Sequence, residues 1–399
     1  MLFRSDRPLI PMDETPGHET YRVALDPNLY FDFTAQQGET IEDDLAQRDF
    51  TINAIAIHLA ALVNDKSKLI DPFQGQRDLD QKIIRSVREQ AFKDDPIRLL
   101  RAFRFASTLE FDIESQTLSQ IKTHRAEVDK VARERVRYEF LLMLEAPQSR
   151  MDLMEPTGLI EVLFPGIEEL KMKPGIPDRK SQWENTLDVF RETENILVHA
   201  DRLLEKHSQL MRESLSTNHH RALLKWCALI HLFAATYDSS SGIINFLKEF
   251  RLSNADIQFI ERTLKFTRII LSGVRSTSEG FKEDSTVYQF IHRSGKELFS
   301  SILLSLAVRL GNQEDIKYFL PVISRILDFY AERYLPAQEK PALLDGDILK
   351  NKLQLKPSPE FKSILEKVEE ARVLGNIHTP DEAEQLAKKL ISSQAELIE

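Results

Sequence analysis

The sequence predicts an α+β protein, with a small mixed β-sheet near the N-terminus followed by an all-helical remainder. Two observations lead to this prediction. Residues 8–12 and 20–35 alternate or run apolar on either side of a polar segment, which is typical of a β-hairpin. The chain has 13 glycines in 399 residues, and its long stretches rich in Leu, Glu, Lys and Arg favour helices. We therefore expect strands within residues 8–70 and little strand after residue 100.

The net charge, the cysteine count and the absence of long apolar runs limit the classes of function that this sequence can have. The formal net charge is −10, so any RNA binding must come from a local cluster of basic residues. The single cysteine, Cys227, rules out a disulfide framework. The sequence shows no secretory signal pattern and no apolar run of eighteen residues, so we expect a cytoplasmic protein with no membrane partner.

The first candidate site lies in residues 47–57. A short acidic helix is expected before it, and the alternation after Asn53 predicts a strand with one face of small residues. Arg48 and Asp49 stand at the mouth of this apolar run, where burying a charge pair is costly. Taken alone, the pair is typical of a surface ion pair. With its flanking residues it indicates a phosphate ligand, because the planar fork of an arginine pairs two phosphate oxygens.

The second candidate site is the predicted helix after Asp95. Arg98, Arg101 and Arg104 fall within one arc of about 120° on the helical wheel, where an ordinary amphipathic helix shows mixed charges. Three like charges there call for an anionic ligand. The alternative for the preceding acidic residues is plain capping, with Asp95 as N-cap and Pro96 as the first helical residue.

Both stretches resemble motifs of one family. Residues 47–57 resemble the R-R-D-F-T-I-N-A motif of the class II tRNA nucleotidyltransferases and bacterial poly(A) polymerases, and residues 94–104 resemble their E-D-x-x-R-x-x-R-x-x-R helix. Residues 71–75 and 84–87 match the connecting motif in order. Members of this family add CCA or A to RNA 3′ ends. The resemblance covers about residues 8–170 and implies RNA, above all tRNA, and ATP or CTP as partners.

The expected domains follow from this resemblance and from the helical pattern. They are a partial nucleotidyltransferase head (1–90), a helical neck with nucleotide-recognition and RNA-binding helices (91–170), a helical body (183–335) and a helical tail (336–399). Within the neck, residues 134–139 resemble the family's E-R-I-x-x-E signature, although any exposed helix with paired charges looks similar.

The resemblance implies roles for the first site. Arg48 would contact phosphate, and Asp49 and Asn53 would lie on the ribose side of the nucleotide. The family usually has two arginines here, and Gln47 stands in place of the first.

The resemblance also implies roles for the recognition helix. Asp95 and Arg98 would present an acceptor and donors to the Watson–Crick edge of the incoming base, and Arg101 and Arg104 would hold phosphate. The motif's leading Glu is Asp94 here, which leaves the choice between CTP and ATP open.

Asp32 and His231 are two further positions for which the sequence allows a functional and a structural interpretation. Asp32 lies between aromatic residues and fits the third catalytic acid of the superfamily, or else a solvated position on an edge strand. Some relatives carry a metal-dependent phosphohydrolase domain in the body, but Asn185 and Leu232 replace the expected ligands. His231 is therefore expected to be a hydrogen-bonded core histidine, and no hydrolase activity is expected.

The front of the family's head domain bears Gly-Gly-x-Val-Arg-Asp and Asp-x-Asp segments, which bind the triphosphate and two magnesium ions. The sequence starts after both, and Asp13-Glu14 in a turn is not accepted as a substitute, so no metal ligand is assigned. We expect either a CCA-, CC- or A-adding enzyme truncated before its magnesium ligands, or a non-catalytic RNA-binding remnant or partner of a separately encoded N-terminal catalytic fragment. We expect no useful transfer by the isolated chain, because the metal ligands dominate this chemistry.

Overall fold

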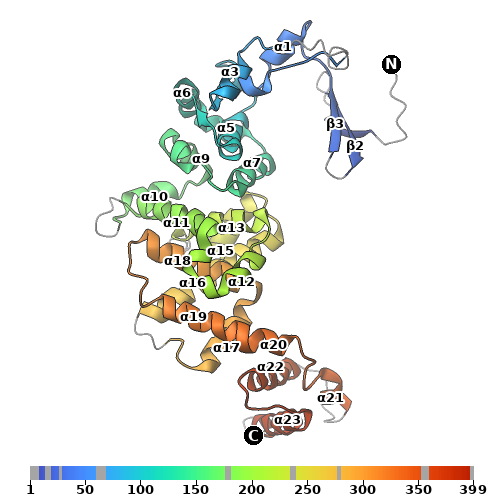
Figure 1. Cartoon of the computed structure of the whole chain (residues 1–399), viewed down its shortest axis with the longest axis vertical. Helices are drawn as coiled ribbons and strands as arrows, with labels where there is room; N and C mark the ends of the chain where they lie inside the picture. The colour runs from blue at the N-terminus through green and yellow to red at the C-terminus, as the bar shows by residue number, and fades with distance from the viewer. Residues whose placement is uncertain are drawn as a thin grey trace. The chain divides into compact units, whose positions relative to one another are not determined.

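The structure is a computed structural model that describes residues 9–13, 19–26, 29–59, 69–175, 181–233, 240–275, 280–351 and 359–395. The chain forms two compact units, Met1–Pro165 and Gly166–Glu399 (Figure 1). Strands occur in the first unit, and the described part of the second unit is helical. The predicted α+β class is confirmed.

The N-terminal sheet has three antiparallel strands in the order β1 (Ile10–Asp13), β2 (Thr20–Asp26) and β3 (Leu29–Thr34). The apolar run at 20–35, expected as one arm of a hairpin, is thus two strands. In their register Tyr21 lies opposite Phe33 and Arg22 lies opposite Asp32. The predicted turn between β1 and β2 lies mostly outside the described residues.

The predicted strand after Asn53 is wrong. Thr51–Asn53 form a 3-10 turn, η1, and of the described residues 54–59 that follow it only Ala56 makes a bridge, to Ile70. The amide of Asn53 donates back to the carbonyl of Phe50, which closes a turn where a strand would run on. Gly75 allows this turn to pack closely, because a Cβ at Gly75 would lie 2.1 Å from the carbonyl oxygen of Thr51.

A second, two-stranded parallel sheet joins β4 (Ile83–Ile84) to β5 (Asp112–Ile113). β5 is the only strand that the structure describes after residue 100. The mixed sheet expected from the sequence is therefore two sheets, one antiparallel and one parallel.

The helices of the first unit pack around α5, whose residues Leu99, Leu100 and Phe103 are fully or almost fully buried. α5 lies against α7, and a short helix, α1, begins at a capping box formed by Thr40 and Asp43. The helical segments are α1 (Ile41–Ala46), α3 (Gly75–Asp80), α4 (Ala91–Asp94), α5 (Arg98–Leu109), α6 (Ser115–His124), η2 (Arg125–Lys130), α7 (Arg133–Glu145), α8 (Met151–Met154), η3 (Glu155–Thr157) and α9 (Leu159–Leu163).

The second unit is built around α18, which is buried from Leu298 to Val308 and packs against α11 and α16. A helix that is apolar all round belongs at such a centre. The helical segments of this unit are α10 (Ile167–Met172), α11 (Gln182–Leu203), η4 (Glu205–His207), α12 (Ser208–Ser214), α13 (Asn218–Ile230), α15 (Ser240–Glu249), α16 (Asn254–Arg275), α17 (Asp284–Ser294), η5 (Gly295–Glu297), α18 (Leu298–Gly311), α19 (Leu320–Phe329), η6 (Tyr330–Tyr334), α20 (Leu335–Gln338), α21 (Gly346–Asn351), α22 (Pro359–Val373) and α23 (Pro380–Ala395).

The last three helices share an apolar cluster of their own, which includes Leu349, Ile364 and Val368. In the part of the chain that the structure describes, no helix combines the length and apolar character needed to span a bilayer.

His231 follows α13 and is a hydrogen-bonded histidine, as expected. Its Nδ1 donates to the carbonyl oxygen of Ala228 at 2.7 Å. Burial lowers the pKa of His231 to about 4, opposed by this hydrogen bond and supported by the charge of Arg268. The imidazole is therefore neutral in the folded protein at neutral pH.

Acidification should destabilise the second unit through His231. Because its pKa is lower in the folded state than its ordinary value of 6.5, the stabilisation is complete above pH 6.5 and is lost as the pH falls toward 4, by at most about 1.4 kcal/mol per pH unit. Fluorescence-monitored urea unfolding between pH 7 and pH 5 tests this, since both tryptophans, Trp183 and Trp226, lie in this unit. His231→Gln should flatten the pH dependence, whereas His199→Gln, at an exposed position, should not. Equal slopes in all three proteins would contradict the assignment.

Candidate functional site

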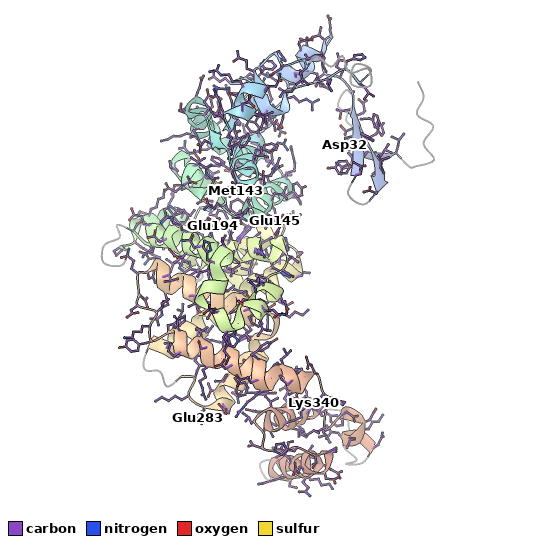
Figure 2. The ribbon with its side chains drawn as sticks, in the orientation of Figure 1. Asp32, Met143, Glu145, Glu194, Glu283 and Lys340 are labelled. Carbon is purple, nitrogen blue, oxygen red and sulfur yellow. The ribbon has the colours of Figure 1, made fainter. Side chains whose placement is uncertain are left out.

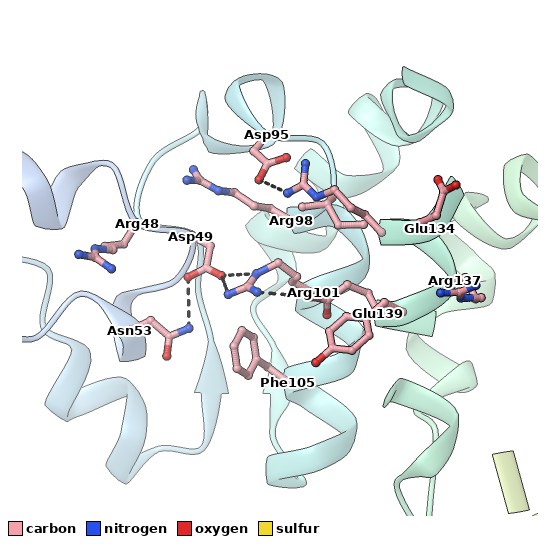
Figure 3. Close-up of a pocket in the computed structure, with 13 residues that line it drawn as sticks. Arg48, Asp49, Asn53, Asp95, Arg98, Arg101, Phe105, Glu134, Arg137 and Glu139 are labelled. Carbon is pink, nitrogen blue, oxygen red and sulfur yellow. Dashed lines mark hydrogen bonds and ion pairs between the residues drawn. The ribbon is translucent and has the colours of Figure 1, made fainter. Parts of the chain in front are cut away.

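A cavity of about 740 Å³ lies in the first unit, between the segment after α1 and the helices α5 and α7 (Figure 3). Its lining contains five arginines and four carboxylates, together with one phenylalanine and one tyrosine. The lining residues are Arg48, Asp49, Asn53, Asp95, Ile97, Arg98, Arg101, Phe105, Glu134, Arg135, Arg137, Tyr138 and Glu139. The three segments bring together charges that lie up to 91 positions apart in the sequence.

Asp49 is one of two buried carboxylates in the lining of this cavity, with Glu139 the other. Its Oδ1 accepts from the backbone amide of Phe50 at 2.9 Å and from Nδ2 of Asn53 at 3.2 Å. Its Oδ2 accepts from both Nε and the terminal guanidinium nitrogen of Arg101, at 2.8 and 2.7 Å. This two-pronged pair fixes the segment after α1 to the middle of α5.

Glu139 of α7 holds the same arginine from the other side. Its carboxylate accepts from Arg101 at 3.4 Å and from Arg104, whose guanidinium also lies 3.8 Å from the centre of the Phe105 ring. Burial works against the charge on Arg101, but Asp49 and Glu139 outweigh it and raise the pKa of Arg101 above its ordinary value. Arg101 and Arg104, predicted to hold phosphate, are thus both paired with carboxylates here.

Asp95 does not cap α5. The helix begins at Arg98 with no side-chain hydrogen bond at its N-cap, and Asp95 has extended backbone angles (φ −142°, ψ 97°), as expected for a residue before proline. The carboxylate of Asp95 accepts instead from Arg135 of α7 at 2.9 Å. The capping interpretation of Asp95 is therefore wrong, and the residue faces the cavity.

Arg98 is anchored by the main chain. One terminal nitrogen donates to the carbonyl oxygen of Gln47 at 2.6 Å and the other to that of Ala91 at 3.3 Å. Burial lowers the pKa of Arg98, opposed by the nearby charges of Asp49 and Asp95. Its guanidinium is placed beside the predicted base-reading carboxylate.

A smaller cavity of about 500 Å³ adjoins the first and shares Arg48, Asp95 and Arg98 with it. Arg48 is half exposed and donates to the buried carboxylate of Asp44 at 2.7 Å. The remaining lining residues are Thr34, Gln37, Gly38, Asp44, Gln47 and Asp94. Asp94 pairs with Arg88 at 2.8 Å.

Asp32 lies apart from these residues. Its carboxylate accepts from Arg22 at 2.7 and 2.9 Å, and this hydrogen bond lowers the pKa of Asp32. Asp32 stands on β3 (Figure 2) and is not among the residues that line either cavity. Its position fits the solvated edge of the sheet that was the alternative.

Neither Asp49 of this site nor Asp32 outside it is arranged as a magnesium ligand. Both oxygens of Asp49 accept hydrogen bonds, Oδ2 from Arg101, and both oxygens of Asp32 accept from Arg22, whereas a hard divalent cation is bound by carboxylate oxygens directly. Among the described residues, no three or more His, Cys, Asp or Glu side chains are grouped to hold a metal ion.

Arg135, Tyr138 and Glu139 are site residues to which the sequence assigned no role. All three belong to the hexamer 134–139, and the spacing of Arg135 and Glu139 puts them on one face of α7. Phe105 was also missed, although it directly follows Arg104.

The chain matches three protein families in order. Residues 18–85 match the family described as "Poly A polymerase head domain", residues 110–171 that described as "Probable RNA and SrmB- binding site of polymerase A", and residues 218–387 that described as "tRNA nucleotidyltransferase domain 2 putative". The chain belongs to the class II CCA-adding tRNA nucleotidyltransferase family. Other nucleotidyltransferases extend this match along most of the chain.

An A-adding tRNA nucleotidyltransferase of Deinococcus radiodurans is 29% identical over 94% of this chain and 84% of its own length. A CC-adding tRNA nucleotidyltransferase of Geobacter sulfurreducens is 43% identical, but over only 35% of this chain and 31% of its own length. A solved structure of a CCA-adding enzyme with ATP has the same fold, with a TM-score of 0.66, 23% identity, and 98% of this chain and 81% of that chain covered. These relatives differ in the nucleotide that they add.

Proposed function

We propose that this nucleotidyltransferase binds CTP or ATP in the cavity between α5 and α7 and adds nucleotides to tRNA 3′ ends in the cytoplasm. The observation that carries the proposal is the placement of Asp95 and Arg98, which line both cavities and are not consumed by capping the helix. Support also comes from the match of residues 110–171 to an RNA-binding family and from relatives named for tRNA.

The pair suits bases that carry an exocyclic amino group. An ionised carboxylate only accepts hydrogen bonds, and a guanidinium only donates them. Cytosine and adenine present an amino donor where uracil and guanine present a carbonyl oxygen. Asp95 would accept from that amino group and Arg98 would donate to a neighbouring ring acceptor. UTP and GTP would place an acceptor against the carboxylate and be rejected.

The phosphate side of the site is assigned to Arg48. Its guanidinium is half exposed and, within the described part of the chain, pairs with the carboxylate of Asp44 alone, so its outer edge can meet a phosphate. Asp49 and Asn53 would lie by the ribose. Arg101 and Arg104 would reach phosphate only by releasing Glu139, and we assign them first to holding Asp49 and α7 in place. Nucleotidyl transfer generally uses divalent ions, and we propose magnesium as the ion, with neither Asp49 nor Asp32 assigned as its ligand.

Asp95→Asn and Arg98→Lys should relax nucleotide selectivity while the fold persists. An amide offers a donor as well as an acceptor, and an ammonium cannot reproduce two fixed donors. We expect the ratio of UTP to CTP dissociation constants, measured by titration calorimetry on the full chain, to fall about tenfold in each variant.

Asp112→Asn is the matched control, because Asp112 is an exposed acid of the same unit that pairs with Arg150 outside the cavity. It should keep the wild-type ratio. Equal ratios in all four proteins, at equal melting temperatures, would mean that Asp95 and Arg98 do not read the base.

A further inference from the structure

The base-reading carboxylate has a partner on another helix. The terminal guanidinium nitrogen of Arg135 donates to Oδ2 of Asp95 at 2.9 Å, and both residues line the 740 Å³ cavity. Arg98, three residues from Asp95, donates instead to two backbone carbonyls. Arg135 is thus the side chain that the structure places on the Asp95 carboxylate.

The hydrogen bond from Arg135 leaves the Asp95 carboxylate able to accept a further hydrogen bond from a base. Two carboxylate oxygens offer about four lone-pair sites, so Oδ1 and part of Oδ2 stay available after Arg135 has bound. The terminal torsion of an aspartate is broad and is not fixed by its own rotamer preference. An arginine on Oδ2 therefore sets the plane of the carboxylate and the direction of the remaining lone pairs.

We propose that Arg135 is a specificity-determining positioning residue for the nucleotide site. It holds the Asp95 carboxylate in one orientation, so that bases with an exocyclic amino group bind and bases with a carbonyl oxygen at that position do not. This inference rests on the proposed function, because it requires Asp95 to read the base. The alternative for a half-exposed arginine in this cavity is direct contact with phosphate.

The two roles differ in what they do to four nucleotides. An arginine that contacts phosphate strengthens the binding of CTP, ATP, UTP and GTP alike, because all four nucleotides carry the same triphosphate. A residue that orients Asp95 acts on the difference between amino and carbonyl bases. The decisive quantity is thus the ratio of dissociation constants and not the affinity for any one nucleotide.

Arg135→Gln in the full chain is expected to lower the UTP-to-CTP and GTP-to-ATP ratios of dissociation constants about tenfold, as loss of a hydrogen bond to a charged group would. Arg135→Lys, which keeps the charge but lacks the planar fork, should recover part of the ratio. The control is Arg133→Gln, which makes the same change one half-turn away on α7, where Arg133 pairs with Asp129 at 3.3 Å. It should leave both ratios unchanged.

The double variant Asp95→Asn/Arg135→Gln separates an action through Asp95 from an independent one. If Arg135 acts through Asp95, adding Arg135→Gln to Asp95→Asn changes the ratios no further. Uniform weakening of all four nucleotides by Arg135→Gln, with unchanged ratios, would overturn the proposal. If Asp95→Asn relaxes the ratios and Arg135→Gln does not, this inference alone fails. If Asp95→Asn leaves them unchanged, the proposed function fails with it.

Discussion

Replacing Glu139 with alanine is expected to lower the free energy of unfolding of the unit Met1–Pro165 by about 3 kcal/mol, the lower end of the range for breaking a buried ion pair. The Glu139 side chain is 8% exposed and that of Arg104 is 16% exposed, so removal of the carboxylate leaves the mostly buried guanidinium of Arg104 without this ion-pair partner. Arg101 loses less, because it keeps Asp49.

Hydrogen exchange of the α5 and α7 amides measures this change, since both tryptophans lie in the other unit. Glu127→Ala is the control, because Glu127 pairs with the well-exposed Lys130 and such surface pairs contribute little to stability. A loss in Glu139→Ala no larger than in Glu127→Ala would show that Glu139 is not what holds the two arginines.

Gly75→Ala is expected to destabilise the same unit by roughly 2 kcal/mol and to weaken CTP binding. The added Cβ would lie 2.1 Å from the carbonyl oxygen of Thr51 and 2.9 Å from Cγ1 of Ile55. Because the nearest atom is backbone, relief requires η1 to move, and η1 carries Asn53 and directly follows the Asp49–Phe50 step. Stability and nucleotide affinity should therefore fall together.

Gly346→Ala provides the matched control for this variant, since a Cβ at Gly346 meets nothing within 4 Å. Calorimetric titration with CTP and the melting temperature are measured on both variants. Wild-type CTP affinity in Gly75→Ala would show that the contact between α3 and η1 does not position the site.

Much of the fold could be predicted because its signals are local. The apolar spacing along α5 and α7, and the small number of glycines, indicate helices without knowledge of tertiary contacts. The alternation of larger and smaller side chains after Asn53 led to the wrong prediction of a strand, because a period of two also fits a turn followed by an isolated bridge. What decides between them is non-local: the amide of Thr51 donates to the carbonyl of Arg85, 34 positions away.

In the candidate site, too, the local arrangement could be predicted and the long-range contacts could not. The wheel placed Arg98, Arg101 and Arg104 on one arc of a helix, and Arg48, Asp49, Asn53, Asp95, Arg98 and Arg101 all line the larger cavity. The wheel could not show the partners, because Glu139 reaches Arg104 from 35 positions away and Arg135 reaches Asp95 from 40. The predicted roles of these residues in binding remain predictions.

The main-chain anchors of Arg98 bear on how this site tolerates mutation over evolutionary time. Arg98 donates to the carbonyl oxygens of Gln47 and Ala91, and a carbonyl is present whatever side chain those positions carry. Position 47 can therefore carry glutamine where the resembling motif has arginine without loosening the guanidinium that we propose faces the base. Side-chain changes at positions 47 and 91 should leave these two anchors of Arg98 in place, and with them the proposed selectivity for the base, even where they alter the affinity for the triphosphate.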